Sequence, residues 1–303
     1  MDVTTSYPRP IVVLAGPHTH GSLVAAMIGQ NPAAYGILET NLSLFDTLDV
    51  QVRELTGLRG TQLHGMIRVL AQLLSGEQTH ASTEMAWRWV FNHMHWPTGW
   101  VRDFILGRIA PLRTVERNTS ALFDKDALER LIAQYQGADF VHVTRHPRAH
   151  GQAIMADGGA VATLLGSYDD SVDPAVLDPQ VLWTRTERSI DKCLQDVPEA
   201  RIHRVHVERL LTAPRRVMRN LAKSLKLPHG KDAINLMMHP ELSEYARPGP
   251  MGAHLGDFPE FMGDPTLPEP DDEMSLEGAL GWREDNAMFL PDTLRLARAR
   301  GYT

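Results

Sequence analysis

The order of hydrophobic and polar residues along the chain predicts alternating strands and helices. Short runs rich in β-branched and aromatic residues predict four strands, at Ile11–Ala15, Leu112–Glu116, Asp139–Thr144 and Ile202–Val207. Between them, apolar residues at helical spacing predict helices at Ser22–Gln30, Lys125–Gln136, Val181–Asp196 and Pro214–Leu225. Strands that alternate with helices indicate parallel βαβ units. We therefore expect an α/β fold whose central parallel sheet of four to five strands is flanked by helices.

Two segments do not fit a plain strand–helix alternation. Residues 41–100 are mostly helical in pattern and carry Trp87, Trp89, Trp96 and Trp100, so they predict a helical insertion. These tryptophans either cap a site or pack between helices, and packing is the more frequent role of buried aromatics. Residues 240–275 are rich in Pro, Gly and acidic residues and predict a long irregular loop. We expect residues 1–303 to form a single domain that includes both segments.

Composition and charge narrow the classes of protein to consider. The chain has 303 residues, of which 43% are hydrophobic and 22% charged, with a net charge of −7. This is typical of a globular protein, and the negative net charge does not favour binding to nucleic acid or to an anionic membrane. The N-terminus resembles no signal peptide, and no apolar run reaches the roughly 18 residues of a membrane span. We therefore expect a cytoplasmic protein without a nucleic-acid or membrane partner, for which a homodimer is compatible with the sequence.

The single cysteine, Cys193, cannot form an intrachain disulfide and suits a reducing compartment. It lies in a helical pattern, where we expect a core residue and not a nucleophile.

The segment from Gly16 to Leu23, GPHTHGSL, follows the first predicted strand and precedes a predicted helix. This arrangement binds phosphate, because backbone N–H groups and the helix dipole point at the anion. The glycine spacing is that of a P-loop, but the lysine expected between Gly21 and Ser22 is absent. A nucleoside triphosphatase is therefore disfavoured. By itself the loop is a weak signal, because strand-to-helix turns often need Gly and Pro for geometry alone.

Further motifs follow this loop in a defined order. They are Asn31-Pro32, LETN at Leu38–Asn41, ERNT at Glu116–Thr119, TRHPR at Thr144–Arg148 and HVERLLTAP at His206–Pro214. With the loop, this series resembles the PAPS-dependent sulfotransferase family, especially its bacterial branch and the tyrosylprotein sulfotransferases. The segment 240–275 resembles the C-terminal donor loop of that family. The resemblance covers almost the whole chain and implies a P-loop-like α/β fold.

The resemblance also implies a co-substrate, 3′-phosphoadenosine 5′-phosphosulfate (PAPS), and a role for individual residues. The backbone of Thr19 to Ser22 and the Ser22 hydroxyl would hold the 5′-phosphate, and Arg145 would bind the 3′-phosphate through its planar fork. The implied donor-binding positions are Thr19, His20, Gly21, Ser22, Leu23, Arg145 and Ala153. Glu39 would be the base that accepts the proton of the acceptor hydroxyl. His18 and Arg117 would stabilise the charge on the group in transfer.

The chain departs from the family pattern at several of these positions. His18 replaces the usual Arg or Lys, His20 replaces a Gly, Gly21 replaces a Thr, and Ala153 replaces the usual Ser. Each lost charged contact typically costs about 1.5–3 kcal/mol. If protonated His18 stabilises the leaving oxygen, activity should fall as the pH rises.

Three interpretations remain. The leading one is transfer of a sulfuryl group from PAPS to a hydroxyl or amine of a small metabolite or a carrier-bound natural product. The second is another reaction on a different phosphate ligand, and the third is a non-catalytic protein that binds a small molecule or a partner.

Metal-dependent and serine-hydrolase chemistry are disfavoured by the motifs. The pairs His18-x-His20 and His93-x-His95 are not in clear strands, and no H-E-x-x-H or C-x-x-C pattern occurs. We therefore predict no metal site. The G-x-S-x-G elbow of a serine hydrolase is also absent around Ser22.

Overall fold

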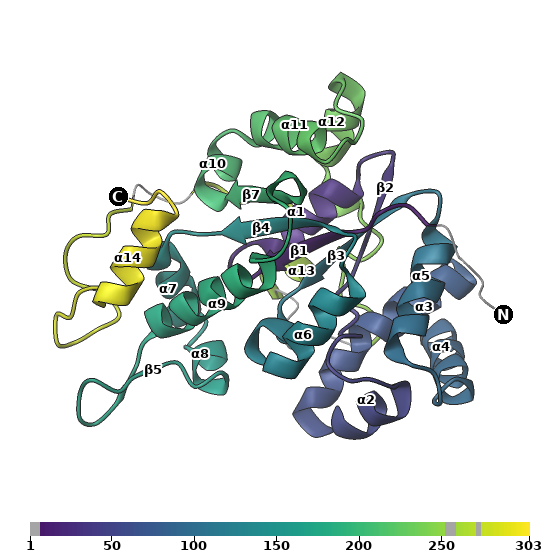
Figure 1. Cartoon of the computed structure of the whole chain (residues 1–303), viewed down its shortest axis with the longest axis horizontal. Coiled ribbons are helices and arrows are strands. Elements are labelled where there is room, and N and C mark those ends of the chain that lie inside the picture. The colour runs from purple at the N-terminus through teal and green to yellow at the C-terminus, as the bar shows by residue number, and fades with distance from the viewer. Residues whose placement is uncertain (1–6, 252–258, 271–273) are drawn as a thin grey trace.

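The computed structural model describes residues 7–251, 259–270 and 274–303, and its centre is a parallel β-sheet (Figure 1). The strand order is β2-β3-β1-β4-β7, and each neighbouring pair is parallel. The strands are β1 (Ile11–Ala15), β2 (Ala34–Ile37), β3 (Arg113–Asn118), β4 (Asp139–Thr144) and β7 (Ile202–His206). The predicted α/β class with a parallel sheet of four to five strands is therefore confirmed. A two-stranded antiparallel ribbon pairs β5 (Tyr168–Asp169) with β6 (Val176–Leu177).

Helices connect the strands and cover both faces of the sheet. In the first part of the chain they are α1 (Gly21–Gly29), α2 (Leu48–Glu54), η1 (Gly57–Leu63), α3 (His64–Ser75), α4 (His80–Asn92), α5 (Thr98–Ile109), η2 (Ser120–Phe123) and α6 (Lys125–Gln134). In the second part they are α7 (Pro147–Ala156), α8 (Ala160–Leu164), α9 (Pro179–Leu194), η3 (Glu199–Arg201), α10 (Val207–Thr212), α11 (Pro214–Ser224), α12 (Lys231–Met237), η4 (Pro240–Leu242), α13 (Pro259–Gly263) and α14 (Pro291–Ala299).

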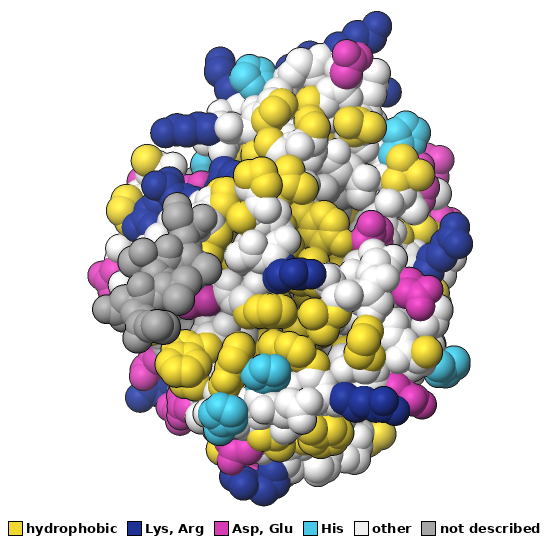
Figure 2. All heavy atoms as spheres, turned by 90° about the vertical axis from the view of Figure 1, so that its right-hand side faces the viewer, with side chains coloured by type: hydrophobic (Ala, Val, Ile, Leu, Met, Phe, Trp, Pro, Cys, Tyr) yellow, Lys and Arg dark blue, Asp and Glu magenta, His cyan; other side chains and the backbone are white. Residues whose placement is uncertain are grey.

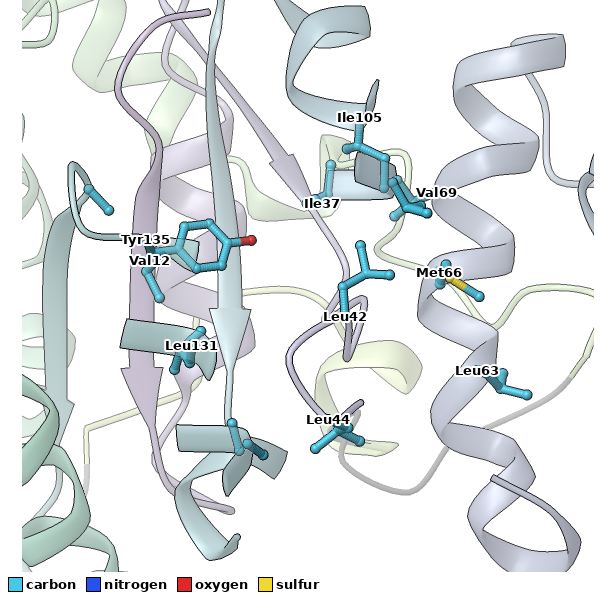
Figure 3. Close-up of a cluster of buried hydrophobic side chains, with 14 of the residues drawn as sticks. Val12, Ile37, Leu42, Leu44, Leu63, Met66, Val69, Ile105, Leu131 and Tyr135 are labelled. Carbon is cyan, nitrogen blue, oxygen red and sulfur yellow. The ribbon is translucent and has the colours of Figure 1, made fainter. Parts of the chain in front are cut away.

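The core consists of one large hydrophobic cluster on each face of the sheet. Even positions of β1, such as Val12, pack with α2–α6 and α9, whereas odd positions, such as Val13, pack with α1 and α10–α12. This division follows from the alternation of side chains along a strand. Figure 3 shows the first cluster, where Val12, Leu131 and Tyr135 lie over the sheet and Met66 and Val69 of α3 face Leu42.

The sequence patterns located the long elements well but missed the edge strand β2. The predicted bounds of β1 and β4 match the structure, and the four predicted helices differ by no more than two residues at either end. β2 has the sequence AYGI, whose glycine weakens a strand pattern. The close approach of α1 to this strand requires the glycine at position 29, since a Cβ on Gly29 would lie 2.5 Å from the Gly36 nitrogen.

Residues 41–100 contain η1, the helices α2, α3 and α4, and the start of α5. Trp89 and Trp96 pack between helices: Trp89 stacks on Phe104 with ring centroids 4.9 Å apart and meets Trp96 edge-on. His93 stacks on Trp89 at 4.1 Å, and its Nδ1 lies 2.6 Å from the Trp89 carbonyl oxygen. These contacts assign His93 to helix packing.

The surface over α3–α5 is not uniformly polar. Figure 2 shows hydrophobic side chains that gather along a hollow on this side of the molecule, with a Lys or Arg side chain near its centre. Phe91 of α4 and Trp100 of α5 are more than half exposed. Among the described residues, no helix has both the length and the apolar character that a membrane crossing requires.

Candidate functional site

The loop between β1 and α1 has a left-handed backbone at two histidines. Both His18 and His20 have φ of 54°, a region that usually favours glycine. A glycine at position 20 would adopt this conformation without the strain that the His20 side chain brings. The Thr19 hydroxyl donates a hydrogen bond to the Gly16 carbonyl at 2.7 Å and closes the loop.

Gly21 begins α1 at a point where there is no room for a side chain. A Cβ there would lie 2.3 Å from the Ala15 Cβ and 3.2 Å from the Arg117 Cδ. The replacement of the family's Thr by Gly21 thus fits this loop. The first turn of a helix has no intrahelical acceptors for its N–H groups, so the amides of Gly21, Ser22 and Leu23 can bind an anion. The Leu23 side chain is buried in the core and contributes only its backbone to such a site.

Glu39 follows β2 and forms a buried ion pair with Arg117 of β3. Arg117 Nη2 donates to Glu39 Oε2 at 2.8 Å, and both side chains are less than 5% exposed. The other oxygen, Oε1, accepts hydrogen bonds from the amides of Thr119 at 2.8 Å and Ser120 at 2.7 Å. The carboxylate is thereby held at the carboxyl edge of the sheet, where ligands of parallel α/β folds bind.

A second buried carboxylate, Glu116, lies one residue before Arg117. Its carboxylate oxygens accept hydrogen bonds from the Thr40 hydroxyl and from the Tyr135 hydroxyl, both at 2.5 Å. Burial raises the pKa of Glu116, and the neighbouring Glu39 raises it further, whereas these hydrogen bonds lower it. Glu116 was not singled out from the sequence, although it belongs to the ERNT motif.

Two cavities lie on either side of the residues that Glu39 contacts. The first has a volume of about 30 Å³ and is lined by Ser22, Glu39 and Arg117, with Tyr245 and Met262 from the C-terminal part of the chain. It therefore joins the first turn of α1 to the Glu39–Arg117 pair.

The second cavity is larger and mostly apolar. Its volume is about 330 Å³, within the range of small-molecule sites. Pro17 of the loop and Thr119 and Ser120 line one part of it. Apolar side chains line most of the rest, namely Leu44, Phe45, Leu58, Phe123, Val161, Leu164 and Leu165. Because Thr119 and Ser120 donate to Glu39, this carboxylate connects the two cavities.

Arg145 is buried directly after β4 and contacts the loop. Its Nη1 donates to the His18 carbonyl oxygen at 3.0 Å, and its own carbonyl accepts from the Trp183 indole at 2.9 Å. His18 is also buried, and its Nε2 lies 3.7 Å from Asp157 at the end of α7. His18 is not among the residues that line either cavity in the described part of the chain.

His150 of α7 lies near this group and was not singled out from the sequence. Burial, together with the neighbouring His18 and Arg145, lowers the pKa of His150 to about 3, so this ring is neutral at pH 7. Ala153 is half-buried one turn further along α7, on the face that His150 and Asp157 share. Arg148 holds the C-terminal segment and donates to the carbonyl oxygens of Ser275 and Ala279.

The structure thus brings together most of the residues that the motifs indicated. Glu39, Arg117 and Ser22 share one cavity, and Arg145 contacts the loop that contains His18 and Thr19. Part of the expected donor loop, residues 252–258 and 271–273, lies outside the described residues.

Residues of other kinds do not add a further centre. Within the described ranges, no group of three or more His, Cys, Asp or Glu side chains could hold a metal ion. Cys193 is buried among apolar side chains, and burial raises the pKa of its thiol to about 12.

The structure thus combines a parallel sheet, a loop before α1 whose amides can bind an anion, and a buried carboxylate–arginine pair. The sulfotransferase family model matches residues 10–231, and the chain belongs to this family. No curated protein matches the sequence.

Two solved structures share the fold. The sulfotransferase domain from the Synechococcus PCC 7002 olefin synthase is 20% identical with a TM-score of 0.74, and the match covers 98% of this chain and 96% of that domain. The sulfotransferase domain from the curacin biosynthetic pathway is 16% identical with a TM-score of 0.70 and 98% coverage of both chains.

Proposed function

We propose that this protein transfers a sulfuryl group from PAPS to a hydroxyl group of a small or carrier-bound acceptor. The observation that carries the proposal is the position of the buried Glu39 carboxylate. It lines the smaller cavity with Ser22 and Arg117. It also accepts hydrogen bonds from the amides of Thr119 and Ser120, which line the larger cavity. In a member of the sulfotransferase family, this geometry supplies an anion site, a base and a cation next to one another.

In this proposal the loop and the first turn of α1 bind the phosphosulfate of the donor. The amides of Gly21, Ser22 and Leu23 face the anion, and Arg117 stabilises the charge on the group in transfer. Glu39 accepts the proton as the acceptor oxygen attacks sulfur. Arg145 orders the loop through the His18 carbonyl and is the proposed partner of the 3′-phosphate.

The apolar cavity of about 330 Å³ supports an acceptor that carries its hydroxyl on an aliphatic chain. Its leucine, valine and phenylalanine side chains favour burial of apolar surface, at about 25 cal/mol per Å². Thr119 and Ser120 place the reactive end of the chain beside Glu39. One of the two solved domains comes from an olefin synthase and the other from the curacin biosynthetic pathway, which is compatible with a carrier-bound acceptor.

The first experiment is a calorimetric titration with 3′-phosphoadenosine 5′-phosphate, the product of the donor. We expect micromolar affinity that is lost in Arg145→Ala and kept in Arg53→Ala, which changes an exposed arginine of α2. Ala153→Ser restores the family's usual side chain and should strengthen binding by about tenfold if it contacts the 3′-phosphate. Binding that is unchanged in Arg145→Ala would contradict the assigned donor site.

The second experiment measures turnover with PAPS and hydroxylated thioesters of different chain length. The proposal predicts that 3-hydroxydecanoyl-N-acetylcysteamine is a better acceptor than its 3-hydroxybutyryl counterpart. Donor binding without turnover of either thioester, of tyrosine or of an amine would favour the non-catalytic binding protein instead.

A further inference from the structure

The largest of the described cavities is a groove along the edge strand β7, away from the cavities that contain Glu39. It has a volume of about 540 Å³, and all five residues of β7 line it. Arg209 of α10 and Arg216, Val217 and Leu221 of α11 form its other wall. Figure 1 shows α10 and α11 next to β7 on one side of the sheet. The groove therefore has a strand as its floor and basic and apolar side chains beside it.

The chain around this groove is basic although the whole protein has a net charge of −7. From residue 209 to residue 226 there are six basic residues and no acidic one: Arg209, Arg215, Arg216, Arg219, Lys223 and Lys226. Arg209 and Arg216 are exposed, and neither pairs with a carboxylate of the described residues. Arg204 pairs with Glu199 at 2.5 Å, but both are exposed, so this pair is weak and exchangeable.

The strand itself has capacity for further hydrogen bonds. Within the described part of the chain, β7 pairs with β4 alone and forms one edge of the sheet. The N–H and C=O groups on the outer side of such a strand can pair with another extended segment. His203, 8% exposed on the floor of the groove, has an Nε2 without a hydrogen-bond partner. A buried polar atom without a hydrogen-bond partner is destabilising by itself.

We propose that this groove binds an acidic, extended segment of a partner protein, which adds a strand to β7. Main-chain hydrogen bonds to β7 would give affinity, and carboxylates near Arg209 and Arg216 would fix the register. The site is separate from the proposed sulfuryl transfer and would bring the partner to the protein.

Other occupants fit the groove less well. A second copy that paired through the same edge would bring Arg204, Arg209 and Arg216 close to their own counterparts, and like charges repel. Single-stranded nucleic acid is usually held by stacking on aromatic side chains, whereas the described lining contains no Phe, Tyr or Trp.

The test uses the full chain and labelled octapeptides in a fluorescence anisotropy titration. The probe alternates Thr and Glu, and its matched controls are the same peptide with N-methyl groups on alternate amides and a peptide that alternates Thr and Lys. We expect the Thr–Glu peptide to bind, and both controls to bind at least about tenfold more weakly. The double variant Arg209→Glu/Arg216→Glu should weaken binding of the Thr–Glu peptide by at least about tenfold.

The control protein is Arg53→Glu/Arg88→Glu, which reverses two exposed arginines of α2 and α4 and should change the affinity less than about twofold. Retained binding of 3′-phosphoadenosine 5′-phosphate and an unchanged melting temperature confirm that both variants are folded. The proposal is overturned if the Thr–Glu peptide does not bind at about 1 mM. It is also overturned if N-methylation has no effect, or if single-stranded DNA or phosphatidylserine vesicles displace the peptide at lower concentration.

Discussion

Two buried carboxylates, Glu39 and Glu187, each pair with an arginine, but of the two only Glu39 lines one of the cavities described above. Glu39 pairs with Arg117 at 2.8 Å and lines the cavity at the first turn of α1. Glu187 of α9 pairs with Arg300 at 2.7 Å, accepts from Thr144 at 2.9 Å and lies 3.0 Å from His142. Glu187 lines none of the described cavities. A buried ion pair therefore does not by itself mark a reaction site, and its access to a cavity makes Glu39 the stronger candidate of the two.

The charged neighbours of Glu187 give it a structural role. Burial alone would raise its pKa, but His142 and Arg300 lower it, to about 2. Arg300 directly follows α14, so the pair joins the C-terminal helix to the end of β4, the strand that precedes Arg145. Glu187 therefore holds α9, the end of β4 and the residue after α14 together.

The largest predicted effect is on catalysis by Glu39. Glu39→Gln keeps the shape and the acceptor for the Thr119 and Ser120 amides but removes the base. The turnover rate with saturating PAPS and acceptor should fall by about 10²–10⁴-fold. The free energy of unfolding should fall less than it would for an ion pair with no cavity beside it, because water in the adjacent cavity solvates Arg117.

The measurement is the initial rate of 3′-phosphoadenosine 5′-phosphate release, with Glu129→Gln on the exposed surface of α6 as the control. A rate within threefold of the unmodified protein would remove Glu39 from the role of base.

The second prediction concerns Glu187 and its partner Arg300. Arg300→Met removes one charged hydrogen bond from Glu187, which keeps its contacts with His142 and Thr144, and should lower the free energy of unfolding by about 1.5–3 kcal/mol. Arg295→Met changes an exposed arginine of the same helix, 75% exposed, and should cost less than about 0.5 kcal/mol. Urea unfolding measures both variants. The folded Arg300→Met protein should keep its turnover rate, and a rate loss as large as that of Glu39→Gln would contradict the distinction between the two carboxylates.

Sequence patterns predicted the fold better than the site, for physical reasons. β1 and β4 are continuous buried strands, so hydrophobic runs identified them, whereas β2 is a short edge strand that contains Gly36 and has little pattern. Motifs indicated Glu39 and Arg117. The hydrogen bonds that Glu39 accepts from Arg117 and from the Thr119 amide were not predictable, because they depend on β2 lying next to β3 in the sheet. His150 gave no signal, since its role depends on burial beside His18 and Arg145.

The third prediction tests the neutral state of His150 through the pH dependence of stability. Its folded pKa of about 3 is below the reference value of about 6.5, so the unfolded chain binds the proton first as the pH falls. The stabilising contribution is complete above about pH 6.5 and decreases below it, by up to about 1.4 kcal/mol per pH unit. His150→Gln should remove this part of the slope between pH 6.5 and 4.5 in urea titrations. The exposed His95→Gln serves as control, and an equal slope in the His150 variant would show that His150 is already charged in the folded protein.

The smallest predicted effect concerns the apolar cavity beside Glu39. Leu165→Val removes one methylene from its wall, and one methylene in an apolar pocket is worth about 1 kcal/mol or more. We expect KM for the 3-hydroxydecanoyl thioester to rise about fivefold while kcat is kept, because the lost contact lies away from the reacting atoms. Leu242→Val, at a leucine that is 61% exposed in η4, should leave KM unchanged. If Leu165→Val lowers kcat and leaves KM unchanged, the acceptor chain does not lie in this cavity, and the comparison would then place the reaction at Glu39 with its acceptor bound elsewhere.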